Sequence, residues 1–376
     1  MARIIQLIAG GGQGGADRVA VALGDGLREA GYDLVYVVNP EFLRHQPSVQ
    51  ERHECRPLSR FQGLPWSELR EFKAFAAGAD LVLTHDSGSR HFALWAKALG
   101  LRPPVWFMRH CISGTTRIGG VQLHRMLVER HVAVSDVIAR GLVECGYPRT
   151  SVSRIYGGVD LAPFVHPDPA RVEAARRELL GDVPAGTLVL GMVARLNLGP
   201  GWRPDRPDFK GYDVLFGALA QVKFPWRVLT LGPDGRIAQD AVRQIAGHQG
   251  CDPSRVLFAG FVKEPSVYYG LMDLNVLPSR NEGLGLAVVE GMAARVPTLG
   301  SRSGGIAEII EDGESGILFE SGDPKALRAA LERVVADRAL RERIAAGGRK
   351  RALEVFDAQL MVRAFDTLLR RELKPR

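Results

Sequence analysis

Two glutamates separated by a glycine-containing segment have the clearest chemical potential in this sequence. Within residues 273–310, DLNVLPSRNEGLGLAVVEGMAARVPTLGSRSGGIAEII, Glu282 and Glu290 are eight positions apart. An ionised carboxylate accepts two O–H donors at once, which suits the vicinal diols of a sugar or a ribose. The pattern predicts a strand, a short loop and a helix that opens near residues 284–287, and amides at a helix start bind phosphate without a metal. We expect Glu282 to stay in the loop and Glu290 to lie deeper.

A second glycine-rich stretch, IAGGGQGGADRVAVAL, occupies residues 8–23. Gly10, Gly12 and Gly15 fit the G-x-G-x-x-G spacing that holds the pyrophosphate of a dinucleotide. That interpretation also expects an acidic residue at the end of the next strand, but YDLVYVV is followed by Asn39. An NAD-dependent oxidoreductase and an enzyme that binds another phosphate-bearing ligand are both left open at this point.

Other candidate residues are histidines at predicted strand ends. His110 ends PPVWFMRH and His85 lies in LTHD, and each is either hydrogen-bonded to neighbours or part of a reaction centre. The four cysteines are widely separated and show no C-x-x-C spacing, so neither a zinc site nor a disulfide framework is expected. An Asp-x-Asp motif, which would hold a divalent ion, is not found in the sequence.

Composition narrows the class of protein. The chain has 376 residues, enough for two domains, and its 46% hydrophobic and 24% charged residues are typical of soluble globular proteins. We find no apolar window of the length of a membrane span and no secretory leader, so we expect a cytoplasmic protein. The net charge of +7 favours anionic partners, but it is spread along the chain without a Lys/Arg tract, so nucleic acid is not expected.

The elements that must position these residues alternate between strands and helices. Predicted strands in the first half are ARIIQLIA, YDLVYVV, ADLVLTH, PPVWFMRH, HVAVS and SVSRIY, and those in the second are TLVLGMVA, WRVLTLG, RVLFAGF, LNVLP and VPTLGS. This alternation predicts an α/β protein with two doubly wound, Rossmann-like domains that face a cleft. Parallel sheets of this kind bind ligands beyond the carboxyl ends of their strands.

Residues 41–73 lack a clear period and mix arginines with aromatic side chains, Phe42, Phe61 and Trp66 among them. A solvated loop with an ordinary helix is one interpretation. The other is a contact with the acceptor or with an anionic membrane surface, where arginines meet phosphate and aromatic rings lie at the interface.

Taken together, these segments resemble the retaining, two-Rossmann-domain (GT-B) glycosyltransferases of family four. Glu282 and Glu290 match the E-x7-E pattern of that family's donor-binding motif. Three further segments are similar to elements of the family. The family's opening segment resembles GGQGGADRVAVALGDGLREAGYDLVYVV, its linker resembles VAVSDVIARGLVECG, and its Arg…Lys-Gly element resembles VARLNLGPGWRPDRPDFKGYDVL. The resemblance implies an acceptor-side domain over residues 1–165, a nucleotide-sugar domain over 166–355, and a helix over 356–376 that returns to the first domain.

The resemblance also implies how the leaving diphosphate is held. The amides of Gly14 and Gly15 would face the diphosphate from the first domain, and Arg195 and Lys210 would neutralise it in place of a metal ion. No cofactor is then expected, and the donor would be a nucleoside diphosphate sugar, with UDP favoured over GDP. Twelve residues, from Leu198 to Phe209, intervene before Lys210; this insertion either covers the donor or loops outward.

For the sugar and the base, the family pattern assigns a larger set. Glu282 would grip the sugar hydroxyls, Glu290 the ribose diol, and His110 would lie beside the sugar, with His85 as the alternative. Further residues would contact the donor through backbone or border it: Gly283, Leu284, Gly285, Leu286, Glu308 and, beside the base, Val262. Leu284 stands where a phenylalanine is common, and Gly157 where an asparagine is usual.

The function that this resemblance implies is transfer of a sugar to a glycan or a lipid-linked acceptor, with retention, in bacterial envelope polysaccharide (lipopolysaccharide-type) assembly. Two alternatives are an NAD-dependent oxidoreductase and a nucleotide-binding module that catalyses nothing.

Overall fold

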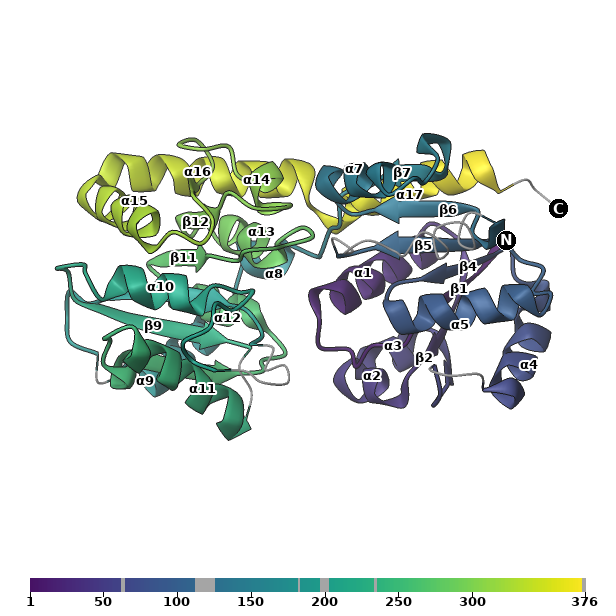
Figure 1. The fold of residues 1–376 in the computed structure, drawn as a ribbon, viewed down its shortest axis with the longest axis horizontal. Coiled ribbons are helices and arrows are strands. Elements are labelled where there is room, and N and C mark those ends of the chain that lie inside the picture. The colour runs from purple at the N-terminus through teal and green to yellow at the C-terminus, as the bar shows by residue number, and fades with distance from the viewer. Residues whose placement is uncertain (62–64, 112–125, 182, 197–202, 233–234, 374–376) are drawn as a thin grey trace. The chain divides into compact units, whose positions relative to one another are not determined.

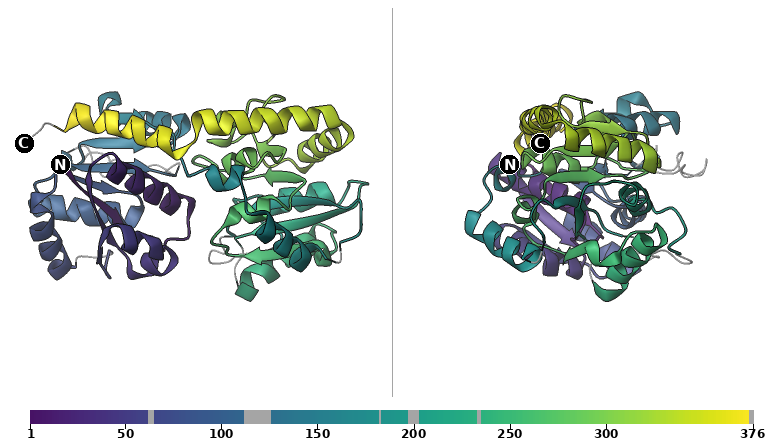
Figure 2. Two further views of the ribbon diagram at one scale, coloured as in Figure 1. Left: turned by 180° about the vertical axis from the view of Figure 1, so that it is seen from behind. Right: turned by 90° about the vertical axis from the view of Figure 1, so that its left-hand side faces the viewer.

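The computed structural model describes residues 1–61, 65–111, 126–181, 183–196, 203–232 and 235–373. The chain divides into two compact units (Figure 1). Unit 1 contains Met1–Asp160 together with Phe356–Arg376, and unit 2 contains Leu161–Val355. Each unit has one parallel sheet with helices on both of its faces (Figure 2), which is the Rossmann-like arrangement predicted from the alternating pattern.

The sheet of unit 1 has seven strands in the order β3-β2-β1-β4-β5-β6-β7, and every pair is parallel. The strands are β1 (Arg3–Ile8), β2 (Asp33–Val38), β3 (Glu54–Pro57), β4 (Leu81–Thr84), β5 (Val105–Arg109), β6 (Arg130–Ala133) and β7 (Val152–Arg154). Its helices are α1 (Gly15–Glu29), α2 (Pro40–His45), α3 (Pro47–Arg52), α4 (Trp66–Phe75), α5 (Ser87–Ala98), α7 (Asp136–Glu144) and α17 (Ala358–Glu372).

Unit 2 repeats the plan with six parallel strands in the order β10-β9-β8-β11-β12-β13. The strands are β8 (Leu188–Val193), β9 (Trp226–Leu231), β10 (Val256–Gly260), β11 (Leu274–Leu277), β12 (Thr298–Ser301) and β13 (Ile317–Phe319). Its helices are α8 (Ala162–Val165), α9 (Pro169–Leu180), α10 (Tyr212–Leu219), α11 (Gly235–His248), α12 (Pro265–Tyr269), α13 (Leu286–Ala293), α14 (Ile306–Ile309), α15 (Pro324–Ala336) and α16 (Arg338–Val355). Short 3₁₀ helices, η1 (Ala76–Gly78), η2 (Arg149–Ser151) and η3 (Pro253–Arg255), precede β4, β7 and β10.

The strands form because they are almost continuously apolar, as parallel strands covered on both faces must be. Five of the six residues of β1 and of β2 are buried. In both sheets the strand order reverses beside the first strand, between β1 and β4 in unit 1 and between β8 and β11 in unit 2. Ligands of doubly wound sheets bind at the carboxyl ends of the strands at such a reversal. Gly14, His85, Arg195 and Glu282 each follow one of these four strands.

The last helix, α17, belongs to unit 1 although its sequence follows all of unit 2. The Tyr32 hydroxyl donates a 2.7 Å hydrogen bond to Asp366, and the ring of Phe365 lies 6.1 Å from that of Trp106 in β5. Gly26 allows this packing, because a Cβ there would lie 2.3 Å from a methyl group of Val362. Helix α17 therefore closes a face of the first sheet against α1.

Apart from residues 62–64, which lie outside the described chain, the segment 41–73 has more regular structure than its sequence suggested. It forms α2, α3, strand β3 and α4, and β3 extends the sheet beside β2. Phe42 and Phe61 are buried in the core of unit 1, whereas Trp66 is 56% exposed. Most of the aromatic character of this segment is thus explained by packing, and Trp66 is left as a surface residue.

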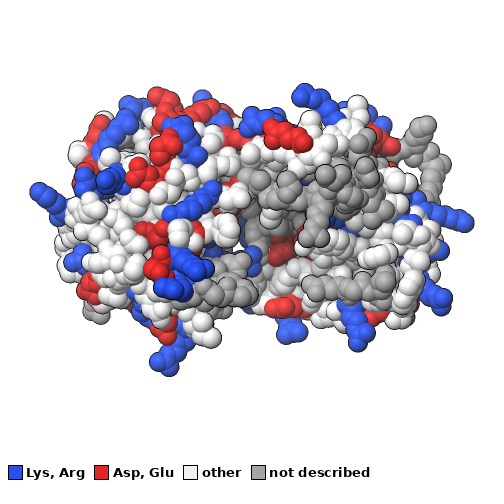
Figure 3. All heavy atoms as spheres, in the orientation of Figure 1, with Lys and Arg blue, Asp and Glu red and all other residues white. Residues whose placement is uncertain are grey.

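Basic and acidic side chains are interspersed over the face seen in Figure 3. Within the described part of the chain, no helix is both long and apolar enough to span a bilayer.

Candidate functional site

A tight turn at residues 208–211 presents Lys210 at the start of α10. The Asp208 carboxylate accepts hydrogen bonds of 2.8 Å from the amides of Lys210 and Gly211, and the Gly211 amide also bonds to the Asp208 carbonyl at 3.3 Å. Gly211 has a φ of +78°, and a Cβ there would lie 2.1 Å from the Pro278 carbonyl oxygen. An aspartate that bonds to amides two and three residues on, followed by glycine, is the usual chemistry of such turns. The 208–211 turn is therefore fixed by its own sequence.

Arg280 fastens this turn to the loop that follows β11. Its backbone amide donates to the Phe209 carbonyl at 2.9 Å, and its guanidinium donates to the Asp208 carbonyl at 2.8 Å and to both Asp213 oxygens at 2.7 Å. The hydrogen bond to Asp213 raises the pKa of Arg280. Burial and the nearby charge of Asp213 raise the pKa of Asp208. Sequence reasoning missed this group, although Asp-x-Lys-Gly is a recognisable turn pattern.

The link brings together two residues predicted from the sequence, Lys210 and Glu282. The Lys210 ammonium forms an ion pair with the Glu282 carboxylate, and the same Glu282 oxygen accepts a 3.2 Å hydrogen bond from the Ser279 hydroxyl. The side chains are 30% and 16% exposed, so both reach solvent. A cation suited to phosphate and a carboxylate suited to hydroxyls thus occupy one spot.

Arg195 lies at the same edge of the sheet, two residues past β8. Strand β8 pairs with β11, the strand that precedes the Glu282 loop. The Tyr212 hydroxyl holds the preceding residue by a 3.0 Å hydrogen bond to the Ala194 carbonyl. The Arg195 side chain is exposed.

The loop after Glu282 is built on glycines. Gly285 has a φ of +104° and precedes the first residue of α13, and the Gly305 amide bonds to the Glu282 carbonyl at 2.9 Å. A Cβ at Gly304 would lie 2.0 Å from that carbonyl oxygen, and one at Gly305 would lie 2.5 Å from the Gly283 carbonyl oxygen. Two loops therefore touch through bare backbone beside Glu282, and Leu284 is buried beneath them.

Glu290 and Glu308 do not share the surface position of Glu282. Glu290 is 1% exposed inside α13, where the Tyr269 hydroxyl donates to its carboxylate at 3.1 Å. Leu286 opens α13, so the segment between the two glutamates is helical over only part of its length. Glu308 lies half-buried in α14, and Arg351 from α16 donates to its carbonyl at 2.9 Å.

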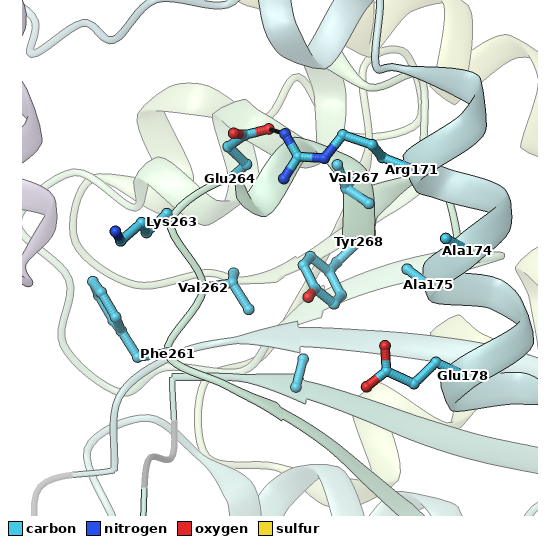
Figure 4. A pocket seen from close by; sticks show the side chains of 11 residues that line it. Arg171, Ala174, Ala175, Glu178, Phe261, Val262, Lys263, Glu264, Val267 and Tyr268 are labelled. Carbon is cyan, nitrogen blue, oxygen red and sulfur yellow. Dashed lines mark hydrogen bonds and ion pairs between the residues drawn. The ribbon is translucent and has the colours of Figure 1, made fainter.

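Val262 lies apart from these residues, just past the outer strand β10. It lines a pocket of about 420 Å³ between the end of β10, α9 and α12 (Figure 4). Tyr268 and Ala175 also face the pocket, and an ion pair of Arg171 with Glu264 lies at its rim. The structure gives unit 2 a hollow at the residue predicted to border the base.

In unit 1 the glycine loop after β1 is held by polar side chains. Asp86, which follows β4, accepts hydrogen bonds from the amides of Ala9 at 2.8 Å and Gly10 at 3.3 Å. Gly14 is the N-cap of α1, and its amide donates to the Asp17 carboxylate at 2.8 Å. The amide of Gly14 is thus engaged within the protein, while Gly15 is the first residue of α1. Asp86 was not anticipated from the sequence.

The two candidate histidines lie together. His85 follows β4 and His110 follows β5, and His85 Nδ1 is 3.2 Å from His110 Nε2. Burial lowers the pKa of His110 to about 4, and burial together with the charge of His110 lowers the pKa of His85. Both rings are therefore neutral near pH 7. His85 is 4% exposed and His110 is half-buried, so His110 is the more accessible of the two.

Family models cover most of both units. The model "Glycosyltransferase Family 4" matches residues 13–163, and "Glycosyl transferases group 1" matches residues 203–337. The chain belongs to the family-four glycosyltransferases. The matched ranges contain the candidate residues of both units except Arg195, which falls between them. The oxidoreductase alternative for the glycine-rich stretch is therefore wrong.

Relatives of this glycosyltransferase act in several settings. It is 28% identical over 347 residues to a D-inositol 3-phosphate glycosyltransferase of Xylanimonas cellulosilytica, covering 82% of this chain and 79% of that protein. It is 31% identical over 160 residues to the lipopolysaccharide core biosynthesis glycosyltransferase LpsE of Rhizobium meliloti, covering 43% of this chain and 46% of that protein.

Solved structures share the fold of this glycosyltransferase. Anabaena HepE in complex with UDP and glucose superposes with a TM-score of 0.83 at 20% identity, covering 99% of this chain and all of that one. Sucrose-phosphate synthase from Thermosynechococcus elongatus gives 0.79 at 22% identity, covering 98% of each chain. These likenesses show the GT-B fold. Within the described residues no cluster of three or more metal-ligating side chains occurs.

Proposed function

We propose that this glycosyltransferase moves a sugar from a nucleoside diphosphate sugar to a glycan or lipid-linked acceptor, with retention of configuration and without a metal ion. The observation that carries the proposal is the contact between Lys210 and Glu282. A donor that enters this site exchanges the internal ion pair for two new partners: its diphosphate binds the ammonium and its sugar hydroxyls bind the carboxylate. Neither charged group is left unpaired before or after donor binding.

The reaction needs stabilisation of negative charge more than it needs a base. The bond from the anomeric carbon to the phosphate oxygen breaks, its electron pair stays on the diphosphate, and a new bond forms to the acceptor oxygen. In front-face attack the departing phosphate oxygen takes the acceptor's proton. Fixed cations aimed at that oxygen lower the barrier, and removal of one such group costs about 3 kcal/mol. Lys210 and Arg195 are assigned this role.

The remaining residues are assigned to donor recognition. Glu282 and the backbone of residues 283–286 hold the sugar, and the base lies beside Val262. Gly14 and Gly15 are assigned to the diphosphate once the Gly14 amide exchanges its hydrogen bond to Asp17. His110, neutral near pH 7, accepts or donates one hydrogen bond beside the sugar. Glu290 holds the ribose diol after its hydrogen bond from Tyr269 is exchanged. Glu308 supports the loop.

UDP is proposed as the nucleotide, because HepE, similar in fold, has been solved with UDP and with UDP-glucose. The relatives LpsE and CapM, named for lipopolysaccharide core and capsular polysaccharide biosynthesis, support a role in bacterial envelope polysaccharide assembly. With this role we place the enzyme in the cytoplasm, with a peripheral contact to the anionic inner face of the cytoplasmic membrane near Trp66, which is exposed.

The test compares Lys210→Ala and Glu282→Ala with Lys223→Ala, an exposed lysine that precedes the amino end of β9. Transfer from UDP-sugars and GDP-mannose is measured with lipid-linked and oligosaccharide acceptors. Lys210→Ala should lower kcat/KM by at least about 100-fold, with Glu282→Ala at least as impaired and Lys223→Ala unchanged. EDTA should leave the rate unchanged. Wild-type rates in the Lys210 variant, or loss of activity in EDTA that Mg²⁺ restores, would contradict the proposal.

A further inference from the structure

An aromatic side chain stands exposed immediately before Lys210. Phe209 is 71% exposed, while every other phenylalanine of the described chain is buried or half-buried. It is the last residue of the insertion that begins at Leu198, whose residues 198–202 lie outside the described part of the chain. Because Lys210 belongs to the proposed donor site, an exposed ring one residue before it is within reach of a ligand held there.

The backbone that carries Phe209 is held firmly. Phe209 and Lys210 are the two central residues of the 208–211 turn, which Asp208 closes through two amide hydrogen bonds. The Phe209 carbonyl accepts the Arg280 amide at 2.9 Å, so the turn is bonded to the loop of Glu282. Central side chains of a tight turn point outward, and their Cα atoms are 3.8 Å apart. Little further ordering of the backbone is therefore needed for the exposed Phe209 side chain to meet a ligand bound at Lys210.

The neighbouring groups indicate what such a ring would meet. Lys210 contacts Glu282, and in the proposed function these residues bind the diphosphate and the sugar hydroxyls. Phe209 is the residue next to Lys210 in the turn, so a pyranose held by Lys210 and Glu282 lies near the backbone that carries the ring. Sugar rings carry hydroxyls at their edge and C–H groups on their faces. Packing an apolar C–H face against an aromatic ring removes both apolar surfaces from water, which is favourable.

We propose that Phe209 is a substrate-contacting residue whose ring forms the apolar wall of the donor-sugar subsite, opposite the hydrogen-bonding wall made by Glu282. This inference rests on the proposed function. It adds Phe209 as a residue that sets how well a given sugar fits the donor-sugar subsite. If Phe209 had a structural role, its truncation would destabilise the fold. A side chain that is 71% exposed contributes little to stability, so we expect the truncation to leave the fold intact.

The experiment measures the Kd of a nucleotide sugar and of its own nucleoside diphosphate by calorimetry. The pair is chosen as the one, among UDP-glucose, UDP-galactose and GDP-mannose, that stabilises the wild type most in a thermal-shift assay. The variants are Phe209→Ala and Phe209→Trp, with Ile237→Ala as the control, because Ile237 is 79% exposed on α11. Phe209→Ala should raise the Kd of the nucleotide sugar about tenfold, which is about 1.4 kcal/mol, and leave the Kd of the nucleoside diphosphate within about twofold of the wild type.

Phe209→Trp should keep the wild-type Kd within about twofold, and Ile237→Ala should change neither ligand. Equal weakening of both ligands by Phe209→Ala, or weakening of neither, overturns the inference while the proposed function stands on Lys210 and Glu282. A change confined to the KM of the acceptor also overturns it, because the ring would then serve the other substrate. If the wild type binds no nucleotide sugar at all, the proposed function fails and the inference fails with it.

Discussion

Arg280 joins the 208–211 turn to the loop that carries Glu282, so Arg280→Met should lower both the stability of unit 2 and the rate of transfer. Two guanidinium nitrogens lie 2.7 Å from the two Asp213 oxygens, and the side chains are 26% and 16% exposed. Opposite charges about 4 Å apart attract by about 4 kcal/mol at the effective dielectric constant near a protein surface. Desolvation and side-chain ordering offset roughly half of this, which leaves a coupling energy of about 2 kcal/mol.

The assay is a double-mutant cycle of Arg280→Met, Asp213→Asn and the pair, followed by urea unfolding. Arg280→Met alone should cost about 3 kcal/mol, because it leaves Asp213 half-buried without its partner. For a domain of this size, that loss corresponds to a Tm lower by about 6–12 °C. Since the turn and the loop lose their link, a misplacement of about 1 Å between Lys210 and Glu282 should lower kcat/KM about 100-fold.

The matched control is Arg338→Met, which removes an arginine that pairs with Glu342 on the surface of α16 and is 84% exposed. It should change neither stability nor rate measurably. If the two single losses at Arg280 and Asp213 add within about 0.5 kcal/mol in the double variant, the two residues are not coupled and the reasoning is refuted.

Two further predictions concern His110 and the glycine loop. Burial lowers the pKa of His110 to about 4 from an ordinary 6.5, so its contribution to the free energy of unfolding is present above pH 6.5 and is lost as the pH falls towards 4. His110→Gln should therefore lose less stability than the wild type across that interval in urea unfolding at each pH, and an unchanged slope would contradict the assignment. At Gly304, φ is +49° and a Cβ would lie 2.0 Å from the Glu282 carbonyl oxygen. Gly304→Ala should lower kcat/KM about 100-fold, whereas Gly313→Ala, at a φ of +80° with open space around it, should spare activity; equal rates in both variants would count against the loop contact.

The sequence predicted the two Rossmann-like units because apolar strands and amphipathic helices alternate regularly along most of the chain. The contact of Lys210 with Glu282 could not come from spacing, since the residues are 72 positions apart. The family pattern assigned both residues to the donor, Lys210 to its diphosphate and Glu282 to its sugar, without predicting their contact. Asp208 and Arg280 were not predicted, because in the sequence they are indistinguishable from ordinary surface charges. Their contacts depend on β8 and β11 being neighbouring strands. The deeper position of Glu290 was expected from its place in the helix and is confirmed, whereas the hydrogen bond from Tyr269 could not be predicted, because Tyr269 belongs to another element.

The placement of α17 has a consequence for synthesis. The sheet of unit 1 is encoded before residue 160, but the helix that covers Trp106 and lies against Gly26 is encoded after Val355. The ribosome therefore synthesises the whole of unit 2 before the helix that covers this apolar face of unit 1 exists. During that interval nascent unit 1 exposes hydrophobic surface of the kind that chaperones bind. Chain order thus makes the lobe that begins first the lobe that matures last.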